Sequence, residues 1–228
     1  TFNDTISKFK KNNICGVNIT MPLKSKSIEL VNQIEKNAEI TKSINCLHFK
    51  NGILKGYNND YYGFNELLKF NNLELGLSHN IILGSGGSAR TIILCLIKQK
   101  AKSIQILSRN KEATMQLLND FQPYLNGTSL KIIKNKCEFK NYNLINCTPI
   151  TLLNNPDISL ISKLPKINYN ILIDINYRID NDFLNFPANI TIDGKSMFIF
   201  QALKSLDIWF ESNISNKLDY KQLEKLLC

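Results

Sequence analysis

The chain has 228 residues, 43% of them hydrophobic, which is enough for one large core or two small ones. No apolar run approaches the roughly 18–20 residues that span a bilayer, and no signal peptide opens the chain, so we predict a cytoplasmic protein that does not enter a membrane. The net charge is +9, but only Arg90, Arg109 and Arg178 are arginines, the usual readers of base edges. The charge therefore favours anionic small molecules over nucleic acid as ligands.

The six cysteines are scattered, mostly inside apolar runs, and no two form a C-x-x-C pair. This pattern predicts buried free thiols in a reducing compartment rather than a disulfide framework or a zinc site. Neither His48 nor His79 has a carboxylate or a cysteine at ligand spacing, so we predict no metal site. The cysteines are Cys15, Cys46, Cys95, Cys137, Cys147 and Cys228.

The first third of the chain alternates short apolar runs with polar helical stretches. The run Ile14 to Val17 is typical of a buried parallel strand, which ends at Pro22 because proline lacks the N–H that a ladder needs. Asn51-Gly52 is a strong hairpin signal. The predicted elements are a polar helix at 1–13, a strand at 14–20, a helix at 26–37, strands at 43–50 and 53–57, and a helix at 61–71.

The chain changes character after a boundary near residues 72–78. Strands and helices then alternate at a spacing typical of βαβ units, which predicts a parallel sheet with right-handed crossovers. The fold class is therefore predicted as α/β, with a small α/β domain followed by a Rossmann-type parallel sheet. The predicted elements are strands at 80–83, 103–107, 130–133, 144–147 and 171–175, helices at 91–98 and 111–121, and final helices at 196–211 and about 216–227.

A glycine-rich turn, Gly84–Arg90, directly follows a predicted strand and opens a helix, which is the context of a dinucleotide fingerprint. Gly84 allows a tight turn, Gly86 lets the backbone approach a pyrophosphate, and the helix N-terminus attracts that anion. An ordinary strand–helix turn is the alternative. The next strand is followed by the cations Arg109 and Lys111, without the acidic residue typical of NAD sites. This loop favours the 2′-phosphate of NADP, unless Arg109 is an ordinary solvated charge.

Two charged residues follow predicted strands of the first region. Lys24 comes after the strand that ends near Pro22, and Asp60 opens the helix after the returning hairpin strand. Open α/β sheets bind ligands at the carboxyl ends of their strands. A lysine and an aspartate beside a nicotinamide can share a proton and exchange it with a substrate hydroxyl, while the cofactor carries the hydride. The plainer alternatives are that Lys24 is an ordinary surface lysine and that Asp60 is the N-cap of its helix.

Eight motifs, in order over nearly the whole chain, together resemble the shikimate dehydrogenase family. The motifs that hold Lys24 and Asp60 resemble the family's N-x-T-x-P-x-K and G-x-N-T-D, and the glycine turn resembles its G-A-G-G-A-A-R. The motifs stand at 18–24, 44–46 (V-N-T in the family), 56–60, 84–90, 108–110 (N-R-T), 145–149 (I-N-A-T-P), 174–177 (D-x-x-Y) and 193–202 (D-G-x-x-M-x-x-x-Q-A).

The resemblance implies reversible, NADP-dependent reduction of 3-dehydroshikimate to shikimate, a step of aromatic amino-acid biosynthesis, by a monomer or homodimer. It implies an N-terminally incomplete substrate domain at 1–75, a Rossmann-type NADP domain at 76–192, and C-terminal helices at 193–228 that return to the first domain. By position, Lys24 and Asp60 are the catalytic pair. The substrate would contact Thr20, Asn45, Tyr177 and Gln201. NADP would contact Gly84, Ser85, Gly86, Gly87, Ser88, Ala89, Ser108, Arg109, Lys111, Thr148, Ile175, Gly194 and Met197.

Several residues depart from the family pattern. The family's opening strand with Ser-x-Ser, which grips the substrate carboxylate, has no match, so the chain is either a fragment or binds its substrate differently. Tyr61 stands where Gly is common and is expected to crowd the site. Two alternatives stay open: a paralogue that uses quinate or a related acid, with NADP or NAD, and a nucleotide-binding protein without enzyme activity. The other departures are Asn59 for Thr, Ala113 for Arg, Thr151 in a cofactor-side loop and Lys195-Ser196 beside the nicotinamide.

Overall fold

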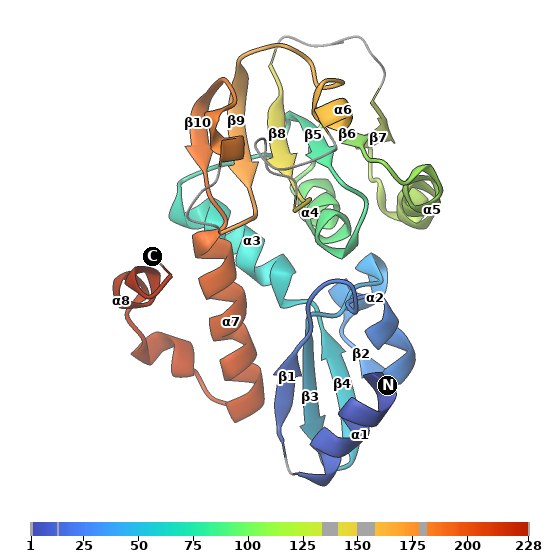
Figure 1. Cartoon of the computed structure of the whole chain (residues 1–228), viewed down its shortest axis with the longest axis vertical. Coiled ribbons are helices and arrows are strands. Elements are labelled where there is room, and N and C mark those ends of the chain that lie inside the picture. The colour runs from blue at the N-terminus through green and yellow to red at the C-terminus, as the bar shows by residue number, and fades with distance from the viewer. Residues whose placement is uncertain (1, 13, 134–140, 150–157, 178–181, 228) are drawn as a thin grey trace.

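Two β-sheets organise the fold in the computed structural model, which describes residues 2–12, 14–133, 141–149, 158–177 and 182–227 (Figure 1). One sheet has four strands in the order β1-β3-β4-β2, and the other has six strands in the order β10-β9-β8-β5-β6-β7. Every pairing in the second sheet is parallel. The α/β class with a Rossmann-type sheet, as predicted from the sequence, is confirmed.

Residues 2–70 form a first lobe around the four-stranded sheet. β3 and β4 pair antiparallel through a turn in which Asn51 and Gly52 have φ of 49° and 77°. A type I′ hairpin turn requires positive φ at both residues, so the predicted hairpin is confirmed. The elements are α1 (Phe2–Lys11), β1 (Gly16–Asn18), the 3-10 helix η1 (Lys26–Leu30), β2 (Gln33–Ile34), α2 (Lys36–Thr41), β3 (Cys46–Lys50), β4 (Ile53–Tyr57) and α3 (Asn59–Phe70).

β1 pairs antiparallel with β3 at the edge of the first sheet, so the prediction of a buried parallel strand at 14–20 was wrong. Ile14 and Cys15, two members of the apolar run, are exposed. The strand is short because the chain soon turns, with the Leu23 N–H donating to the Thr20 carbonyl at 2.9 Å. An antiparallel sheet can leave one face solvated, so an apolar run does not by itself indicate a strand buried on both faces.

The helix predicted at 26–37 was also wrong, because η1, β2 and the start of α2 occupy this stretch. Asn32 Oδ1 accepts a hydrogen bond from the Leu54 N–H at 2.9 Å. Glu35 caps α2 by accepting from the Ala38 N–H at 3.1 Å. Side chains that bond the backbone in this way compete with a continuous helix, and β2 is then free to pair in parallel with β4.

The described residues between 79 and 192 form a second lobe around the six-stranded sheet, and most of its helices and strands lie close to their predicted bounds. α4 starts at Gly87 rather than at Thr91, and the stretch Ala89–Ile97 is buried throughout. β10 and α6 were not predicted; the three central residues of β10 are exposed. The elements are β5 (His79–Leu83), α4 (Gly87–Lys98), β6 (Ser103–Leu107), α5 (Lys111–Phe121), η2 (Gln122–Tyr124), β7 (Ser129–Ile132), β8 (Asn143–Asn146), α6 (Ile158–Ile161), β9 (Tyr169–Asp174), η3 (Asp182–Asn185) and β10 (Ala188–Ile192).

The last helices return the chain to the first lobe (Figure 1). α7 (Lys195–Phe210) packs closely against α3, and a Cβ at Gly63 would lie 2.6 Å from the Met197 carbonyl oxygen. Near its end, Trp209 Nε1 donates to the Leu47 carbonyl of β3 at 2.9 Å. The single helix predicted at about 216–227 is split into η4 (Ile214–Lys217) and α8 (Tyr220–Lys225). The domain boundaries at 75/76 and 192/193 stay a prediction.

Within the described residues, no helix combines the length and the apolar character that crossing a membrane requires. Cys46 and Cys95 are buried and Cys147 is partly buried, but Cys15 is exposed, so the prediction of buried thiols was wrong for Cys15. Burial raises the pKa of the Cys46 thiol to about 11. Predictions for Cys137, Cys228, Thr151 and Arg178 concern positions outside the described residues.

A charged cluster joins the two lobes behind α4. Arg90 of α4 donates through Nε to the Thr41 carbonyl at 2.6 Å and through its terminal nitrogen to Asp120 of α5. Lys42 Nζ lies 2.6 Å from the same carboxylate. Burial alone would raise the pKa of Asp120, but hydrogen bonds from Lys42, Arg90 and Gln116 outweigh burial and lower it from 3.8 to about 2. Hydrogen bonds and ion pairs therefore join the two lobes on this side.

We expect Asp120→Asn to lower the free energy of unfolding by about 2 kcal/mol at neutral pH. A depressed pKa stabilises the folded state above the unfolded value of 3.8 and stops doing so as pH falls through about 2. Urea unfolding of both proteins should therefore show a difference at pH near 7 that shrinks in strong acid. Glu112→Gln removes the same charge from an exposed position of α5 and is the control. A difference independent of pH would contradict the account.

Candidate active site

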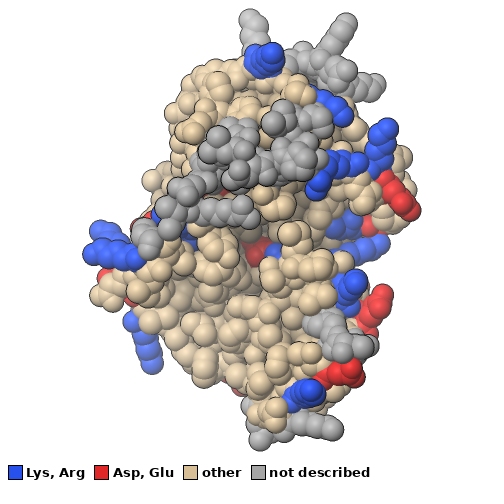
Figure 2. Space-filling model, in the orientation of Figure 1, with Lys and Arg blue, Asp and Glu red and all other residues tan. Residues whose placement is uncertain are grey.

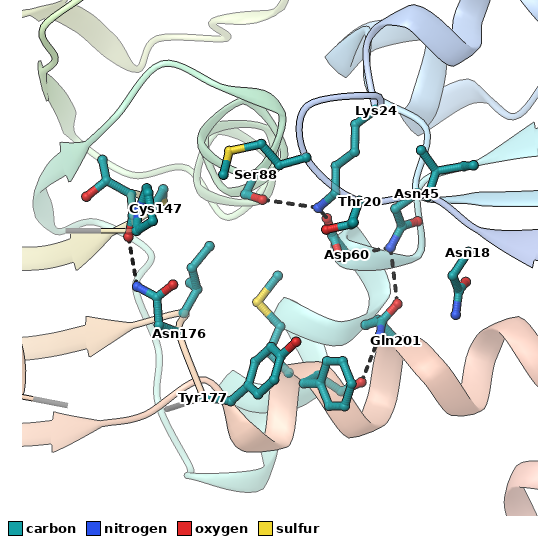
Figure 3. A pocket seen from close by; sticks show the side chains of 17 residues that line it. Asn18, Thr20, Lys24, Asn45, Asp60, Ser88, Cys147, Asn176, Tyr177 and Gln201 are labelled. Carbon is teal, nitrogen blue, oxygen red and sulfur yellow. Dashed lines mark hydrogen bonds and ion pairs between the residues drawn. The ribbon is translucent and has the colours of Figure 1, made fainter. Parts of the chain in front are cut away.

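A cavity of about 480 Å³ lies where the two lobes meet. On one side are the carboxyl ends of β8 and β9 and the start of α4, and on the other are the loop after β1 and the start of α3, with α7 forming a further wall. Ligands of open parallel sheets bind at this end of the strands. Figure 3 labels ten of the lining residues, among them Lys24, Asp60 and Ser88.

Lys24 and Asp60 meet at this cavity (Figure 3). Lys24 Nζ lies 2.6 Å from Asp60 Oδ2, and the two side chains are only 16% and 8% exposed. Asn58, not Asp60, is the N-cap of α3, since its side chain accepts from the Tyr61 N–H. The carboxylate of Asp60 in the first turn is therefore available to the lysine, at the helix end that favours negative charge.

Asn45 links the ion pair to α7. Its Nδ2 donates to Asp60 Oδ1 at 2.8 Å and to Gln201 Oε1 at 3.2 Å, while its Oδ1 accepts from the Asn59 N–H at 2.7 Å. Each oxygen of the Asp60 carboxylate thus has its own donor, and these charge-assisted bonds hold it in one orientation. The structure brings four predicted residues, Lys24, Asp60, Asn45 and Gln201, into one connected network.

The other predicted substrate residues, Thr20 and Tyr177, also line the cavity. Thr20 lies in the loop after β1, and Tyr177 follows β9. The Tyr177 ring is 45% exposed and stacks on Phe198 with centroids 4.2 Å apart. Both residues are exposed, so a ligand in the cavity can reach their hydroxyls.

The glycine turn has the geometry that a dinucleotide needs. Gly84 has a φ of +105°, which a residue with a Cβ rarely adopts, and no described atom lies within 4 Å of where a Cβ would stand at Gly86. Backbone N–H groups at the start of α4 are thus open to an anion. Ser85 Oγ lies 2.8 Å from Ser108 Oγ, which joins the ends of β5 and β6. These residues fit the dinucleotide that the turn implies.

The remaining predicted cofactor residues fall into three groups. Thr148, Ile175 and Met197 line the cavity, together with Ser88. Ala89 is fully buried in the main core, so its side chain does not face a ligand. Arg109, Lys111 and Gly194 are not among the residues that line the cavity; Arg109 and Lys111 are exposed after β6, and Gly194 is buried beside the Ile175 carbonyl.

Several cavity residues were not among the predicted site residues. Phe198 follows Met197 and lies one helical turn before Gln201, a spacing that places two side chains on one face and could have revealed it. Asn176 donates to the Thr148 carbonyl at 2.8 Å, which ties the ends of β8 and β9 together. The others are Asn18, Ile19, Met21, Cys147 and Pro149, each next to or near a predicted residue.

Tyr61 does not crowd the site, so that expectation was wrong. The ring packs against the main core under Lys98, whose Nζ lies 4.7 Å from the ring centroid, and Tyr61 is not among the residues that line the cavity. Helix geometry explains this, because Tyr61 and Asp60 are neighbours in sequence and so point in different directions from α3. No group of three or more potential metal ligands occurs in the described ranges.

The parallel sheet, its glycine turn and the buried ion pair define a class: a dinucleotide-binding α/β protein with a lysine–aspartate pair in the cleft. Residues 1–47 match the family model described as the shikimate dehydrogenase substrate binding domain. The chain is 34% identical over 210 residues to the shikimate dehydrogenase (NADP(+)) of Nitrosopumilus maritimus, an alignment covering 90% of this chain and 76% of that one. This chain belongs to the shikimate dehydrogenase family.

Two further comparisons extend over almost the whole chain. The shikimate dehydrogenase (NADP(+)) of Clostridium perfringens strain 13 is 28% identical over 231 residues, covering 99% of this chain and 83% of that one. The crystal structure of shikimate dehydrogenase from Aquifex aeolicus superimposes with a TM-score of 0.77 at 25% identity, covering 98% of this chain and 80% of that one. Both lobes are thus shared with these proteins.

Proposed function

We propose that this chain interconverts shikimate and 3-dehydroshikimate with NADP as its cofactor. The observation that carries the proposal is the Lys24–Asp60 pair, 2.6 Å apart, at a cavity next to a dinucleotide turn. Oxidising a secondary alcohol removes a hydride from carbon and a proton from the hydroxyl. The Lys24–Asp60 pair is suited to accept the proton. The names of the relatives support both the substrate and the cofactor.

Lys24 is the group that exchanges a proton with the substrate hydroxyl, and Asp60 holds it in place. Asn45 fixes the second oxygen of the carboxylate, so the carboxylate cannot turn away when the charge on Lys24 changes. When bound, NADP supplies the acceptor for the hydride. The low exposure of both side chains limits the access of water to the pair, which strengthens their interaction.

The walls of the cavity suit a small acid with several hydroxyl groups. Thr20, Asn45, Tyr177 and Gln201 offer hydroxyl and amide groups that both donate and accept. A polar group of a bound ligand that finds no partner costs about 1–3 kcal/mol, so this lining discriminates by the number and position of hydroxyls. The substrate carboxylate is drawn to a chain with net charge +9.

Residues of the second lobe and of the start of α7 hold the cofactor in this proposal. The turn from Gly84 to Ser88 binds the pyrophosphate, and Arg109 with Lys111 pairs with the 2′-phosphate. Thr148, Ile175 and Met197 line the cavity wall where the nicotinamide would lie. Gly194 stays close to Ile175 and supports that wall.

The proposal includes a cytoplasmic protein that acts as a monomer or homodimer on small molecules, not on nucleic acid. Lysine and arginine side chains are scattered around the face shown in Figure 2 rather than gathered in one patch, and a nucleic-acid interface would need such a patch. The competing substrate is quinate.

A spectrophotometric assay of NADPH formation tests the proposal. We expect the chain to reduce NADP with shikimate faster than with quinate, and faster than it reduces NAD with either acid. A higher rate with quinate would assign the chain to the paralogue. No reduction with either acid, in a protein that binds NADP, would indicate a nucleotide-binding protein without this activity.

A further inference from the structure

Lys24 has a second partner, which comes from the opposite lobe. Among the described residues, two side chains accept hydrogen bonds from its Nζ: Asp60 Oδ2 at 2.6 Å and Ser88 Oγ at 3.3 Å (Figure 3). Ser88 is the second residue of α4 and part of the glycine turn. One end of the proposed nucleotide site therefore touches the proposed proton-transfer residue directly.

Close packing of the turn on the first lobe fixes this contact. A Cβ at Gly87 would lie 2.5 Å from Ser43 Oγ and 3.5 Å from Lys24 Cβ, so a side chain at this position would force Ser43 or the turn to shift. One helical turn further on, Thr91 Oγ1 accepts from Asn58 Nδ2 at 2.8 Å, in a bond that is buried. Together with the Arg90 cluster, these contacts leave α4 little freedom to move relative to Lys24.

The chemistry of an amine explains what a second acceptor does. A lysine ammonium has three N–H groups; with two directed at Asp60 and Ser88, the third is left for another acceptor. After proton loss, the two remaining N–H groups can stay on these acceptors, which leaves the lone pair in the direction of the departed proton. With Asp60 alone, the amine could rotate about its last carbon–nitrogen bond and lose that alignment.

We infer that Ser88 is a positioning residue, which aims the proton-exchanging lone pair of Lys24 at the substrate hydroxyl; this inference rests on the proposed function. The hydroxyl is a property of this chain, because the G-A-G-G-A-A-R motif has alanine at this position. Ser88 thus acts through Lys24, in addition to any contact of its backbone with the cofactor. The contact also joins the nucleotide turn to the acid–base pair.

Ser88→Ala tests the inference, and alanine suits both the helix and the half-buried position. We expect kcat to fall about threefold to tenfold, with the KM for shikimate and for NADP little changed. A raised KM for NADP with unchanged kcat would overturn the inference, because Ser88 would then serve only the cofactor. Ser25→Ala is the control: it removes an exposed serine hydroxyl next to Lys24 that makes no side-chain cap hydrogen bond, and an equal loss of kcat in this variant would also contradict the inference.

A double-mutant cycle separates positioning from other roles. In a Lys24→Ala background, Ser88→Ala should lower kcat no further, since there is no amine left to orient. If the loss of kcat in the double variant equalled the product of the losses in the two single variants, Ser88 would act independently of Lys24. That result would contradict the inference.

A further experiment, which uses no substrate, keeps this test separate from the test of the proposed function. The rate of reductive methylation at Lys24, followed by peptide mass spectrometry, should rise about threefold or more in Ser88→Ala, with exposed Lys26 as the internal reference. Equal rates in the two proteins would overturn the inference. A wild-type chain that is inactive with shikimate but shows the rate difference would overturn the proposed function alone.

Discussion

Lys24→Ala should lower kcat for shikimate oxidation by about 10²–10⁴-fold, the usual contribution of a positioned acid–base group. The KM for shikimate should change far less, because Thr20, Tyr177 and Gln201 still line the cavity. The variant leaves the Asp60 carboxylate without its ammonium but still bonded to Asn45, so circular dichroism and thermal unfolding should accompany the kinetics to verify the fold.

Lys26→Ala is the matched control for this prediction. Lys26 is the first residue of η1, lies two positions from Lys24 and is exposed. The same loss of charge at this site should leave kcat and KM close to those of the parent chain. If Lys24→Ala kept full activity, or if both variants lost activity equally, Lys24 would not be the proton-exchanging group.

Arg109→Ala should raise the KM for NADP by about tenfold to a hundredfold, as expected when a charge-assisted bond to a phosphate is lost. The KM for NAD should change little, because NAD lacks the 2′-phosphate. Arg109 is exposed directly after β6, where a loop cation can reach an adenosine ribose that lies along the turn. Steady-state kinetics at saturating shikimate gives the KM for each cofactor in the variant and in the parent chain.

Lys102→Ala controls for the general loss of positive charge. Lys102 is also exposed but precedes β6, at the opposite end of the strand from Arg109. The Lys102→Ala variant should bind NADP and NAD only slightly more weakly than the parent chain, and to the same extent for both cofactors. An Arg109→Ala variant that lost affinity for the two cofactors to the same extent would rule out the pairing with the 2′-phosphate.

The second lobe was predictable because its signals are local. Its central strands β5, β8 and β9 contain apolar runs, and the glycine turn has a sequence signature that requires Gly84 with a positive φ. The first lobe was less predictable because single polar side chains decide it. Asn32 and Glu35 bond backbone groups and break the expected helix, an effect that hydrophobic spacing does not register.

The site was predicted in part for a related reason. Lys24 and Asp60 each follow a strand, so their place at a ligand-binding edge could be inferred from the order of elements. The contacts that orient them could not. Asn45 reaches both Asp60 and Gln201, which is 156 residues away in sequence, and Ser88 meets Lys24 from the other lobe. Such bonds depend on how the lobes pack, and no local pattern specifies that.

The most direct test of the account is a crystal structure of the chain with shikimate and NADP bound together. The account predicts that Lys24 Nζ lies within about 3.2 Å of the hydroxyl on the carbon that faces the nicotinamide, with Asp60 still paired to it. A reacting hydroxyl beyond the reach of Lys24, held instead by another side chain or by water alone, would contradict the central claim.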